Sequence, residues 1–225
     1  MKHPVLAALC ALLCLVTSSA TRAADAPHNF AKWEKEIAAY EAADRATPPP
    51  QGAILFTGAS TIRRWTTLLK DFPNHTVLNR GVGGSEIEDI THFADRIVFP
   101  YAPRVIFLRS GGNDIFKGKT SERAFADFKA FVATVHAKLP KTEIIFISQN
   151  PTMARLAQWD KEKALNTAVA DYARKTSNVR YLDMADMVLG ADGLPRLDLF
   201  VADKLHFNEA GYKLFAERIR PFMPK

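Results

Sequence analysis

Four short stretches, far apart in the chain, each supply one part that acyl-transfer chemistry needs. They are residues 58–60 (GAS), 79–85 (NRGVGGS), 111–114 (GGND) and 203–206 (DKLH). This chemistry needs a nucleophile, a base that is oriented by an acid, and N–H donors for the negatively charged oxygen of the intermediate. Serine, histidine, aspartate, glycine and asparagine in these stretches supply those parts in a workable order. Each stretch is a weak signal alone, and the combination is the informative feature.

Ser60 lies between a predicted strand and a predicted helix. The apolar run 53–56 precedes it, and residues 61–65 read as the first turns of a helix. A serine at this junction exposes its Oγ at the carboxyl end of a strand, close to helix-terminal N–H groups. Serine is also a preferred N-cap residue. Taken alone, this stretch favours the capping role.

An acidic residue stands three positions before a histidine in three pairs: Asp25/His28, Asp89/His92 and Asp203/His206. The first pair lies at the start of the mature chain, where order is least expected. The second lies inside a predicted helix that begins at Ser85, with Ser85 and Glu88 spaced as a capping box, and His92 is about 10 Å along that helix. The third lies on a connection before the last predicted helix, where catalytic groups concentrate. We therefore expect His206 to be the functional histidine.

The four stretches together resemble the SGNH/GDSL hydrolases, an esterase and lipase superfamily whose blocks supply Ser, Gly, Asn and His. FTGASTIRRW, VLNRGVGGSE, GGND and DKLHFNEAGY occur in block order, and the similarity spans about residues 53 to 222. The detailed pattern is most similar to small bacterial GDSL-type esterases that look like platelet-activating-factor acetylhydrolase catalytic subunits. The first block of the family is usually Gly-Asp-Ser, whereas this chain has Ala59, which affects the expected activity level and specificity more than the reaction type.

By this resemblance, Ser60 is the nucleophile of a triad with Asp203 and His206. The oxyanion hole consists of the backbone N–H groups of Ser60 and Gly84 and the side-chain amide of Asn113. Physical chemistry gives the same roles: His206 Nε2 removes the serine proton, Asp203 fixes the histidine tautomer, and glycine at position 84 lets the substrate approach the backbone.

Simpler interpretations of the glycine and asparagine positions remain open. Gly81, Gly83 and Gly84 can form an ordinary turn after a strand, which we favour for the first two, and Asn113 can form an Asx-turn. The stretch 79–85 lacks both the G-x-G-x-x-G spacing and the Walker A lysine, so a nucleotide-binding loop is not expected. The scattered histidines have no metal-ligand spacing. We expect neither a cofactor nor a metal.

Apolar runs alternate with helical patterns along residues 53–225. This alternation indicates right-handed βαβ units, and with the resemblance it predicts a three-layer α/β/α sandwich around a five-stranded parallel sheet, the flavodoxin-like SGNH hydrolase fold. Ser60, Gly84 and Asn113 each follow a strand at its carboxyl end, where such sheets bind ligands. The predicted strands are near 53–56, 76–79, 104–108, 143–148 and 179–182, and the predicted helices are near 61–70, 86–98, 121–139, 159–176 and 208–221.

Residues 1–23 read as a signal peptide with Lys2 near its start, an apolar run and small residues near a cleavage site. The apolar run is shorter than the roughly 20 residues that span a bilayer. A lipoprotein anchor is disfavoured because leucine precedes both Cys10 and Cys14. We therefore predict a periplasmic or secreted protein with no stable membrane insertion after cleavage, which is expected near Ala23, with residues 18–20 (SSA) as the alternative site.

The mature chain divides into an N-terminal helix with a Pro-rich linker at 24–52 and a hydrolase domain at 53–225. Phe30, Trp33, Ile37 and Tyr40 form one face of the N-terminal helix, which we interpret as packing on the domain. Both cysteines lie in the signal, so no disulfide is available. Basic and acidic residues are interleaved, with a net charge near +4 after cleavage, so nucleic-acid binding is not expected.

The sequence as a whole predicts an exported serine esterase that hydrolyses short acyl or acetyl esters of a small molecule or carbohydrate through an acyl-enzyme intermediate. The alternative is a catalytically impaired SGNH-fold protein that binds an envelope carbohydrate or acylated polymer. The oligomeric state is left open. In the irregular segment near the predicted site, the candidates for lining a substrate pocket are Met153, Arg155, Leu156 and Trp159.

Overall fold

A computed structural model describes residues 28–224, so the predicted signal peptide lies outside the described residues. Five parallel strands form one sheet in the order β2-β1-β3-β4-β5. Each predicted strand is present within a few residues of its expected position. The strands are β1 (Ile54–Gly58), β2 (Val77–Gly81), β3 (Val105–Arg109), β4 (Glu143–Ile147) and β5 (Val179–Leu182).

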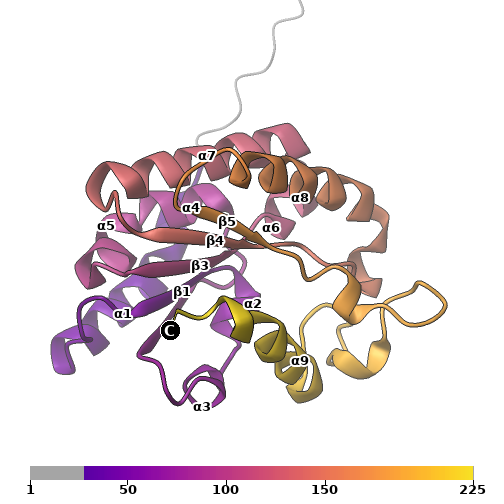
Figure 1. The fold of residues 1–225 in the computed structure, drawn as a ribbon, viewed down its shortest axis with the longest axis horizontal. Helices are drawn as coiled ribbons and strands as arrows, with labels where there is room; N and C mark the ends of the chain where they lie inside the picture. The colour runs from indigo at the N-terminus through magenta and orange to yellow at the C-terminus, as the bar shows by residue number, and fades with distance from the viewer. Residues whose placement is uncertain (1–27, 225) are drawn as a thin grey trace, which may run out of the picture.

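Helices cover both faces of the sheet (Figure 1). The helices are α1 (Glu34–Ala46), α2 (Ser60–Arg63), α3 (Leu68–Asp71), α4 (Ile87–His92), α5 (Ala94–Ile97), α6 (Gly112–Phe116), α7 (Ser121–Lys138), α8 (Trp159–Ala173) and α9 (Glu209–Ile219). α7 and α8 lie on one face, whereas α3 and α9 lie on the other. This is the predicted three-layer α/β/α sandwich. None of the helices between residues 28 and 224 is both long enough and apolar enough to cross a membrane.

Alternating strand residues build two separate cores. Leu55 of β1 packs with the helices on the α7 side, whereas its neighbours Ile54 and Phe56 pack on the α9 side. The same alternation holds in β3 and β4, because successive side chains of a strand point to opposite faces. Near-continuous apolar runs are therefore required in these strands, since both faces of a covered parallel sheet are buried.

Two predicted helices are each broken in the structure. The expected helix 61–70 is replaced by α2 and α3. At the break the carbonyl oxygen of Ile62 accepts the Trp65 N–H at 3.0 Å and the Asn79 side-chain amide at 2.7 Å, in place of the N–H four residues on that a continuing helix would supply. The expected helix 86–98 is divided into α4 and α5 at Phe93, whose backbone leaves helical geometry while its ring enters the core.

The predicted capping box of Ser85 and Glu88 is wrong by one residue. The N-cap of α4 is Glu86, whose backbone N–H donates to Asp89 Oδ2 at 2.8 Å. Ser85 instead takes part in a turn, where its N–H donates to the carbonyl oxygen of Val82. The apolar face predicted for this helix is buried as expected, at Ile87, Ile90, Ala94 and Ile97.

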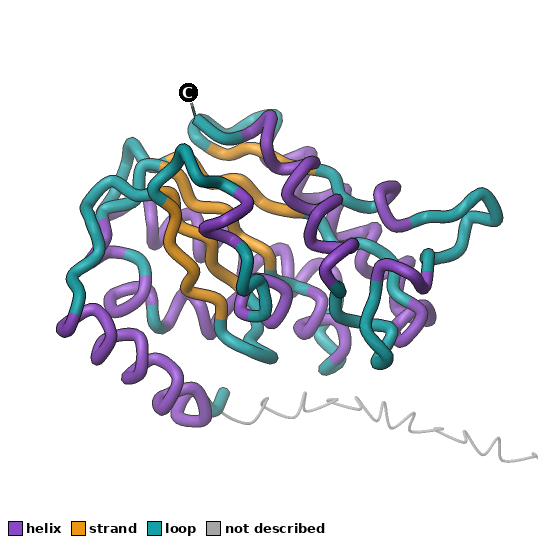
Figure 2. The backbone as a smooth tube through the Cα atoms, turned by 90° about the horizontal axis from the view of Figure 1, so that it is seen from below, coloured by secondary structure: helices purple, strands orange, loops and turns teal. Residues whose placement is uncertain are grey.

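The N-terminal helix packs on the domain as interpreted from its apolar face. Ile37 is fully buried, and Phe30, Trp33 and Tyr40 pack around it against the core on the α7 side. Figure 2, which views the molecule from below, shows α1 at the outer surface at the lower left. The helix therefore approaches the loop that follows β2, where Gly84 lies.

Candidate active site

Ser60 is placed at the carboxyl end of β1 as the first residue of α2. The N-cap of this short helix is Ala59, so the alternative interpretation of Ser60 as the cap is wrong. The Ala59 N–H donates to the carbonyl oxygen of Arg109 at 2.9 Å, which continues the β1–β3 ladder by one residue. The Ser60 hydroxyl is thereby left to contact the loop before α9.

His206 lies within hydrogen-bonding distance of Ser60 although 146 residues separate them in sequence. His206 Nε2 is 2.9 Å from Ser60 Oγ, and His206 Nδ1 is 2.7 Å from Asp203 Oδ2. The other carboxylate oxygen of Asp203 accepts the backbone N–H groups of Leu205 and His206, each at 2.9 Å. The structure thus brings together the three side chains that the sequence selected as a triad.

The aspartate of this group is held in its charged form. Partial burial acts to raise the pKa of Asp203, but the hydrogen bonds from the His206 side chain and from two backbone N–H groups outweigh it and lower that pKa to about 2. A charged carboxylate at Nδ1 keeps the proton on that nitrogen, so Nε2 is left as the acceptor for the Ser60 proton.

Asn113 lies in the first turn of α6, and its amide is held from two sides. Its Nδ2 donates to the carbonyl oxygen of Ser85 at 2.9 Å, and its Oδ1 accepts from Arg155 Nη1 at 3.0 Å. These contacts replace the Asx-turn alternative. One N–H of the amide group remains for a ligand, because the two contacts use only one of its two N–H groups.

Gly84 lies in a turn and its backbone φ is +77°, a value that residues other than glycine rarely adopt. Its position places it in a groove of about 430 Å³ that Ser60, Asn113 and His206 also line. Within the described residues, the backbone N–H groups of Ser60 and Gly84 make no hydrogen bond. The three residues predicted to supply the oxyanion donors therefore line the same groove.

A second, smaller cavity of about 50 Å³ also begins at Ser60. Residues from the ends of β3 and β4 form its inner wall, and Arg109 and Glu162 are its buried charged groups. Burial lowers the pKa of the Arg109 guanidinium to about 10, against the opposing effect of Glu162. Burial also raises the pKa of Glu162 to about 7, against the hydrogen bond from Gln158 and the two nearby arginines.

Arg155 is the only one of the four candidates from the irregular segment that lines these two cavities. Its guanidinium stacks on Phe116, at 4.1 Å from the ring centroid, while it bonds Asn113. Met153 and Leu156 are instead exposed at the surface. Arg155 was predicted only from its location in the irregular segment. Its contact with Asn113 could not be predicted, because the two residues are 42 positions apart in sequence.

Three side chains of the N-terminal segment support the loop that carries Gly84, a role that was not predicted from the sequence. Tyr40 Oη donates to the carbonyl oxygen of Gly81 at 2.6 Å. Glu36 accepts the Gly83 N–H at 3.3 Å and also pairs with Arg63 of α2. The Trp33 ring lies against Gly84, where an added Cβ would be 3.2 Å from it.

Asp114, the neighbour of Asn113, fixes α6 to the start of α4. Both of its carboxylate oxygens are 3.2 Å from the backbone nitrogen of Ile87. Burial raises the pKa of Asp114 to about 6, although the Lys119 ammonium at 3.2 Å opposes this. This contact holds the first turn of α6, which carries Asn113, next to the end of the loop that follows β2.

The histidines of the other two acid–histidine pairs make packing and ion-pair contacts away from Ser60. His92 stacks face to face on Phe30, with ring centroids 3.8 Å apart. His28 contacts Asp89 at 2.7 Å and Glu88 at 3.2 Å, whereas Asp25 lies outside the described residues. Neither histidine lines the groove or the cavity at Ser60.

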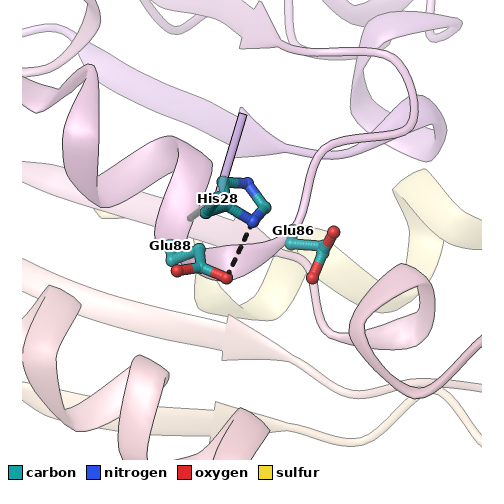
Figure 3. Close-up of side chains that lie close together, drawn as sticks. All are labelled: His28, Glu86 and Glu88. Carbon is teal, nitrogen blue, oxygen red and sulfur yellow. Dashed lines mark ion pairs between the residues drawn. The ribbon is translucent and has the colours of Figure 1, made fainter. Parts of the chain in front are cut away.

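His28, Glu86 and Glu88 gather in a cluster with the spacing of metal ligands (Figure 3). Protein cations already neutralise its carboxylates: Lys117 is 2.7 Å from Glu86, and Lys119 contacts Glu86 and Glu88. We therefore interpret the cluster as an ion-pair network that attaches the N-terminal segment to α4.

Comparisons with known proteins identify a family for the arrangement. The model of the GDSL-like lipase/acylhydrolase family matches residues 37–214. A search of curated proteins found no match.

Solved structures share the fold at low sequence identity. A proposed platelet activating factor from Streptococcus pneumoniae has a TM-score of 0.76 and 23% identity, with 86% of this chain and 94% of that chain covered. A GDSL-like lipase from Bacteroides thetaiotaomicron has a TM-score of 0.72 and 18% identity, covering 86% and 98%. A catalytic mutant of an acetylxylan esterase from Geobacillus stearothermophilus has a TM-score of 0.63 and 15% identity, covering 78% and 96%.

Glu162→Gln is expected to weaken the pH dependence of stability. An acid whose pKa rises from 4.5 to about 7 on folding binds more protons in the folded state within that window. Stability therefore falls as the pH rises from about 4.5 to 7. Gln has no such titration and can still accept the hydrogen bond from Gln158. Thermal midpoints measured at pH 5 and pH 8 should fall less in the variant than in the wild type, and parallel curves would contradict this assignment.

Proposed function

The chain belongs to the GDSL-like lipase/acylhydrolase family, and on this basis we propose that it is an exported serine esterase for acetyl and other short acyl esters. It acts through an acyl-enzyme intermediate, with Ser60, His206 and Asp203 as the triad. The observation that carries the proposal is the continuous contact from Ser60 Oγ to His206 at 2.9 Å and from His206 to Asp203 at 2.7 Å.

The reaction begins when His206 Nε2 removes the proton of Ser60 as its Oγ attacks the ester carbonyl. The negatively charged oxygen is stabilised by the N–H groups of Ser60 and Gly84 and by the amide of Asn113. Each such donor typically contributes about 3 kcal/mol to transition-state stabilisation. His206 then protonates the leaving alcohol, and water releases the acyl group by the same route.

The smaller cavity at Ser60 is the site for the acyl group, and its size restricts that group. Its volume of about 50 Å³ has room for about three or four atoms of water size. Each further methylene gains about 0.8 kcal/mol only if protein atoms surround it. Acyl chains longer than a few carbons therefore have to leave the cavity and lose this gain.

The open groove is the site for the leaving alcohol. Its volume is about 430 Å³, and Glu36, Arg63, Arg64 and Arg155 give it a polar wall. A hydroxyl-rich alcohol such as a carbohydrate can hydrogen-bond to these groups. A carbohydrate ester is consistent with the fold shared with the acetylxylan esterase.

Export is part of the proposal, because residues 1–23 have the composition of a cleaved signal peptide. The enzyme would then act in the periplasm or outside the cell on acylated material there. Mass determination of the amino terminus after expression in a secreting host tests this step.

Ser60→Ala is expected to reduce ester hydrolysis by at least about 10³-fold while the protein stays folded, because the nucleophile is lost. His206→Ala should be equally inactive. His92→Ala is the matched control and should stay within about threefold of the wild type, since its ring packs on Phe30. The measurement is kcat/KM for p-nitrophenyl acetate together with circular dichroism. Wild-type turnover in Ser60→Ala would exclude the serine mechanism.

A fluorophosphonate probe separates this proposal from the alternative of a catalytically impaired binding protein, which the Ala59 departure raised. The wild type should be labelled at Ser60, and Ser60→Ala should not. Absence of labelling in the folded wild type would favour the binding protein.

Esters of increasing acyl length should show a maximum within the first few carbons. The reason is the small volume of the cavity behind Ser60. The measurement is kcat/KM for p-nitrophenyl esters from acetate to dodecanoate, kept below their critical micelle concentrations. A steady rise to dodecanoate would mean that the acyl chain occupies a site other than this cavity.

Glu36→Ala is expected to lower kcat about tenfold with little change in KM. Glu36 joins the Gly83 N–H to Arg63, so its loss frees the loop that holds the Gly84 donor, and small misplacements of reacting groups are costly. Glu36→Gln can still accept the Gly83 N–H and should lose less. Glu41→Ala, on the same helix but paired with Arg96, is the control. Equal effects of Glu36→Ala and Glu41→Ala would show that only helix stability matters.

A further inference from the structure

Arg155 lies within one hydrogen bond of Asn113, the side chain assigned to the oxyanion hole. Its Nη1 donates to Asn113 Oδ1 at 3.0 Å, and the same nitrogen is 3.4 Å from the carbonyl oxygen of Gly112. The residue is half-buried, and it lines both the groove and the smaller cavity at Ser60. A guanidinium is always positively charged in proteins, so a fixed charge lies close to the place where the reaction develops a negative one.

The contact between Arg155 and Asn113 is supported from two other parts of the chain. The guanidinium carbon of Arg155 lies 4.1 Å from the centroid of the Phe116 ring, at the end of α6. The backbone beside it is also attached, because the Ala154 N–H donates to the carbonyl oxygen of Lys204 at 3.3 Å. Lys204 belongs to the loop that carries the acid and the base of the triad. Arg155 is thus held between α6 and that loop.

Asn113 is held at both ends of its amide. Its Nδ2 donates to the carbonyl oxygen of Ser85 at 2.9 Å, and its Oδ1 accepts from Arg155. Hydrogen bonds to a charged group are stronger than those between neutral groups, and groups joined by hydrogen bonds polarise one another. Arg155 therefore draws electron density toward Oδ1 and makes the second N–H of Nδ2 a stronger donor. That N–H is the one that the proposed function assigns to the oxyanion.

We propose that Arg155 is a positioning residue of the oxyanion hole: it holds and polarises the Asn113 amide, and it assists hydrolysis through that amide. This role rests on the proposed function, because an oxyanion forms only when Ser60 attacks an ester carbonyl. It differs from the alcohol-binding role of the groove wall, since the partner of Arg155 is then a protein amide and not the substrate.

The two roles of Arg155 predict different kinetics. Negative charge on the carbonyl oxygen is small in the bound ester and large in the transition state, so a polarised donor lowers the barrier more than it strengthens substrate binding. Loss of Arg155 then lowers kcat and leaves KM almost unchanged. A residue that only contacted the alcohol would change KM, or would matter more for one leaving group than for another.

The first measurement is kcat and KM for p-nitrophenyl acetate in Arg155→Met and Arg155→Lys. Met keeps an unbranched apolar stem against Phe116 but removes the charge and every N–H donor. We expect kcat to fall about tenfold in Arg155→Met, with KM within about twofold of the wild type. Lys restores a charged donor without the planar guanidinium, so Arg155→Lys should lose no more than about threefold.

The decisive measurement combines Arg155→Met with Asn113→Ala. Asn113→Ala alone should lower kcat by about 10²- to 10³-fold, the usual loss for one oxyanion donor. Adding Arg155→Met should then change kcat by no more than about twofold, because the effects of residues that act through one another are not additive. A side chain with only a structural role would lower kcat by the same factor in both backgrounds.

Phenylboronic acid provides a test that needs no Asn113 variant. His206 takes the serine proton as a B–O bond forms to Ser60 Oγ, and the product is a tetrahedral anion that mimics the transition state. The inhibition constant should rise in Arg155→Met by about the same factor as kcat falls.

Arg180→Met is the matched control. Arg180 of β5 also lies over a phenylalanine ring, at 4.6 Å from the centroid of Phe222, and it pairs with Glu143 of β4. It lines neither the groove nor the smaller cavity, so Arg180→Met should keep the wild-type kcat and KM. Thermal midpoints establish that every variant is folded, and Arg155→Leu takes the place of Arg155→Met if the latter is unstable.

Equal losses from Arg155→Met in the presence and in the absence of the Asn113 amide would overturn the positioning role. A rise in KM without a fall in kcat, or an unchanged inhibition constant, would also overturn it. The esterase proposal would stand in each of these cases, since Ser60 would still be labelled by the fluorophosphonate. A folded wild type that is not labelled would instead remove the proposed function itself.

Discussion

The close approach of β1 to β3 at the carboxyl edge of the sheet is the constraint on which the site depends. A Cβ on Gly58 would lie 2.1 Å from the carbonyl oxygen of Arg109, so the two backbones can meet only because position 58 is glycine. From this point the Ala59 N–H bonds the Arg109 carbonyl at 2.9 Å, and the Val82 N–H bonds the Gly58 carbonyl at 2.7 Å. The close approach at Gly58 therefore positions both Ala59, the residue before Ser60, and the loop that leads to Gly84.

Polar contacts attach α1 to β2 and to the segment before β3. Arg80 of β2 donates to Tyr101 Oη at 2.7 Å and pairs with Asp44 of α1, and Tyr101 in turn donates to Asp44 at 2.6 Å. Tyr40 extends this network to Gly81. Partly buried pairs of this kind gain little net stability, because desolvation opposes the attraction, but they accept only a narrow range of geometries. The family match begins at residue 37, within α1, so Trp33 and Glu36 add to the site from outside the matched region.

Elements and site residues that follow from local sequence patterns could be predicted. Side-chain contacts between distant elements could not. The five strands were predictable because both faces of each central strand are buried, which requires apolar runs such as 105–108. Ser60, Asn113 and His206 were predictable as neighbours because parallel strands end at one edge and the last helix returns to it. The break between α2 and α3 was not, and the Asn79 amide that contacts this break comes from another strand. The contacts of Glu36 and Arg155 were equally hidden, since an exposed helix face and an irregular segment carry no signal of their partners.

Arg109 is a buried charged side chain whose cost in stability the surrounding core has to offset. Each unsatisfied buried polar group costs about 1–3 kcal/mol, and domains of this size retain only about 5–15 kcal/mol in total. The aromatic core on the α9 side offsets this, with Phe56 stacked on Phe107 at 4.6 Å and Trp65 packed edge-on against Phe56 directly beneath the site. These rings lie in β1, β3 and the turn after α2, the elements that lead to Ser60 and Arg109. The guanidinium is held between the carbonyl oxygen of Ser148 and the Asn150 side chain, both at the end of β4. The carboxyl ends of β3 and β4 are therefore joined by a buried cation, and the packed rings of the α9 side offset the cost of burying it.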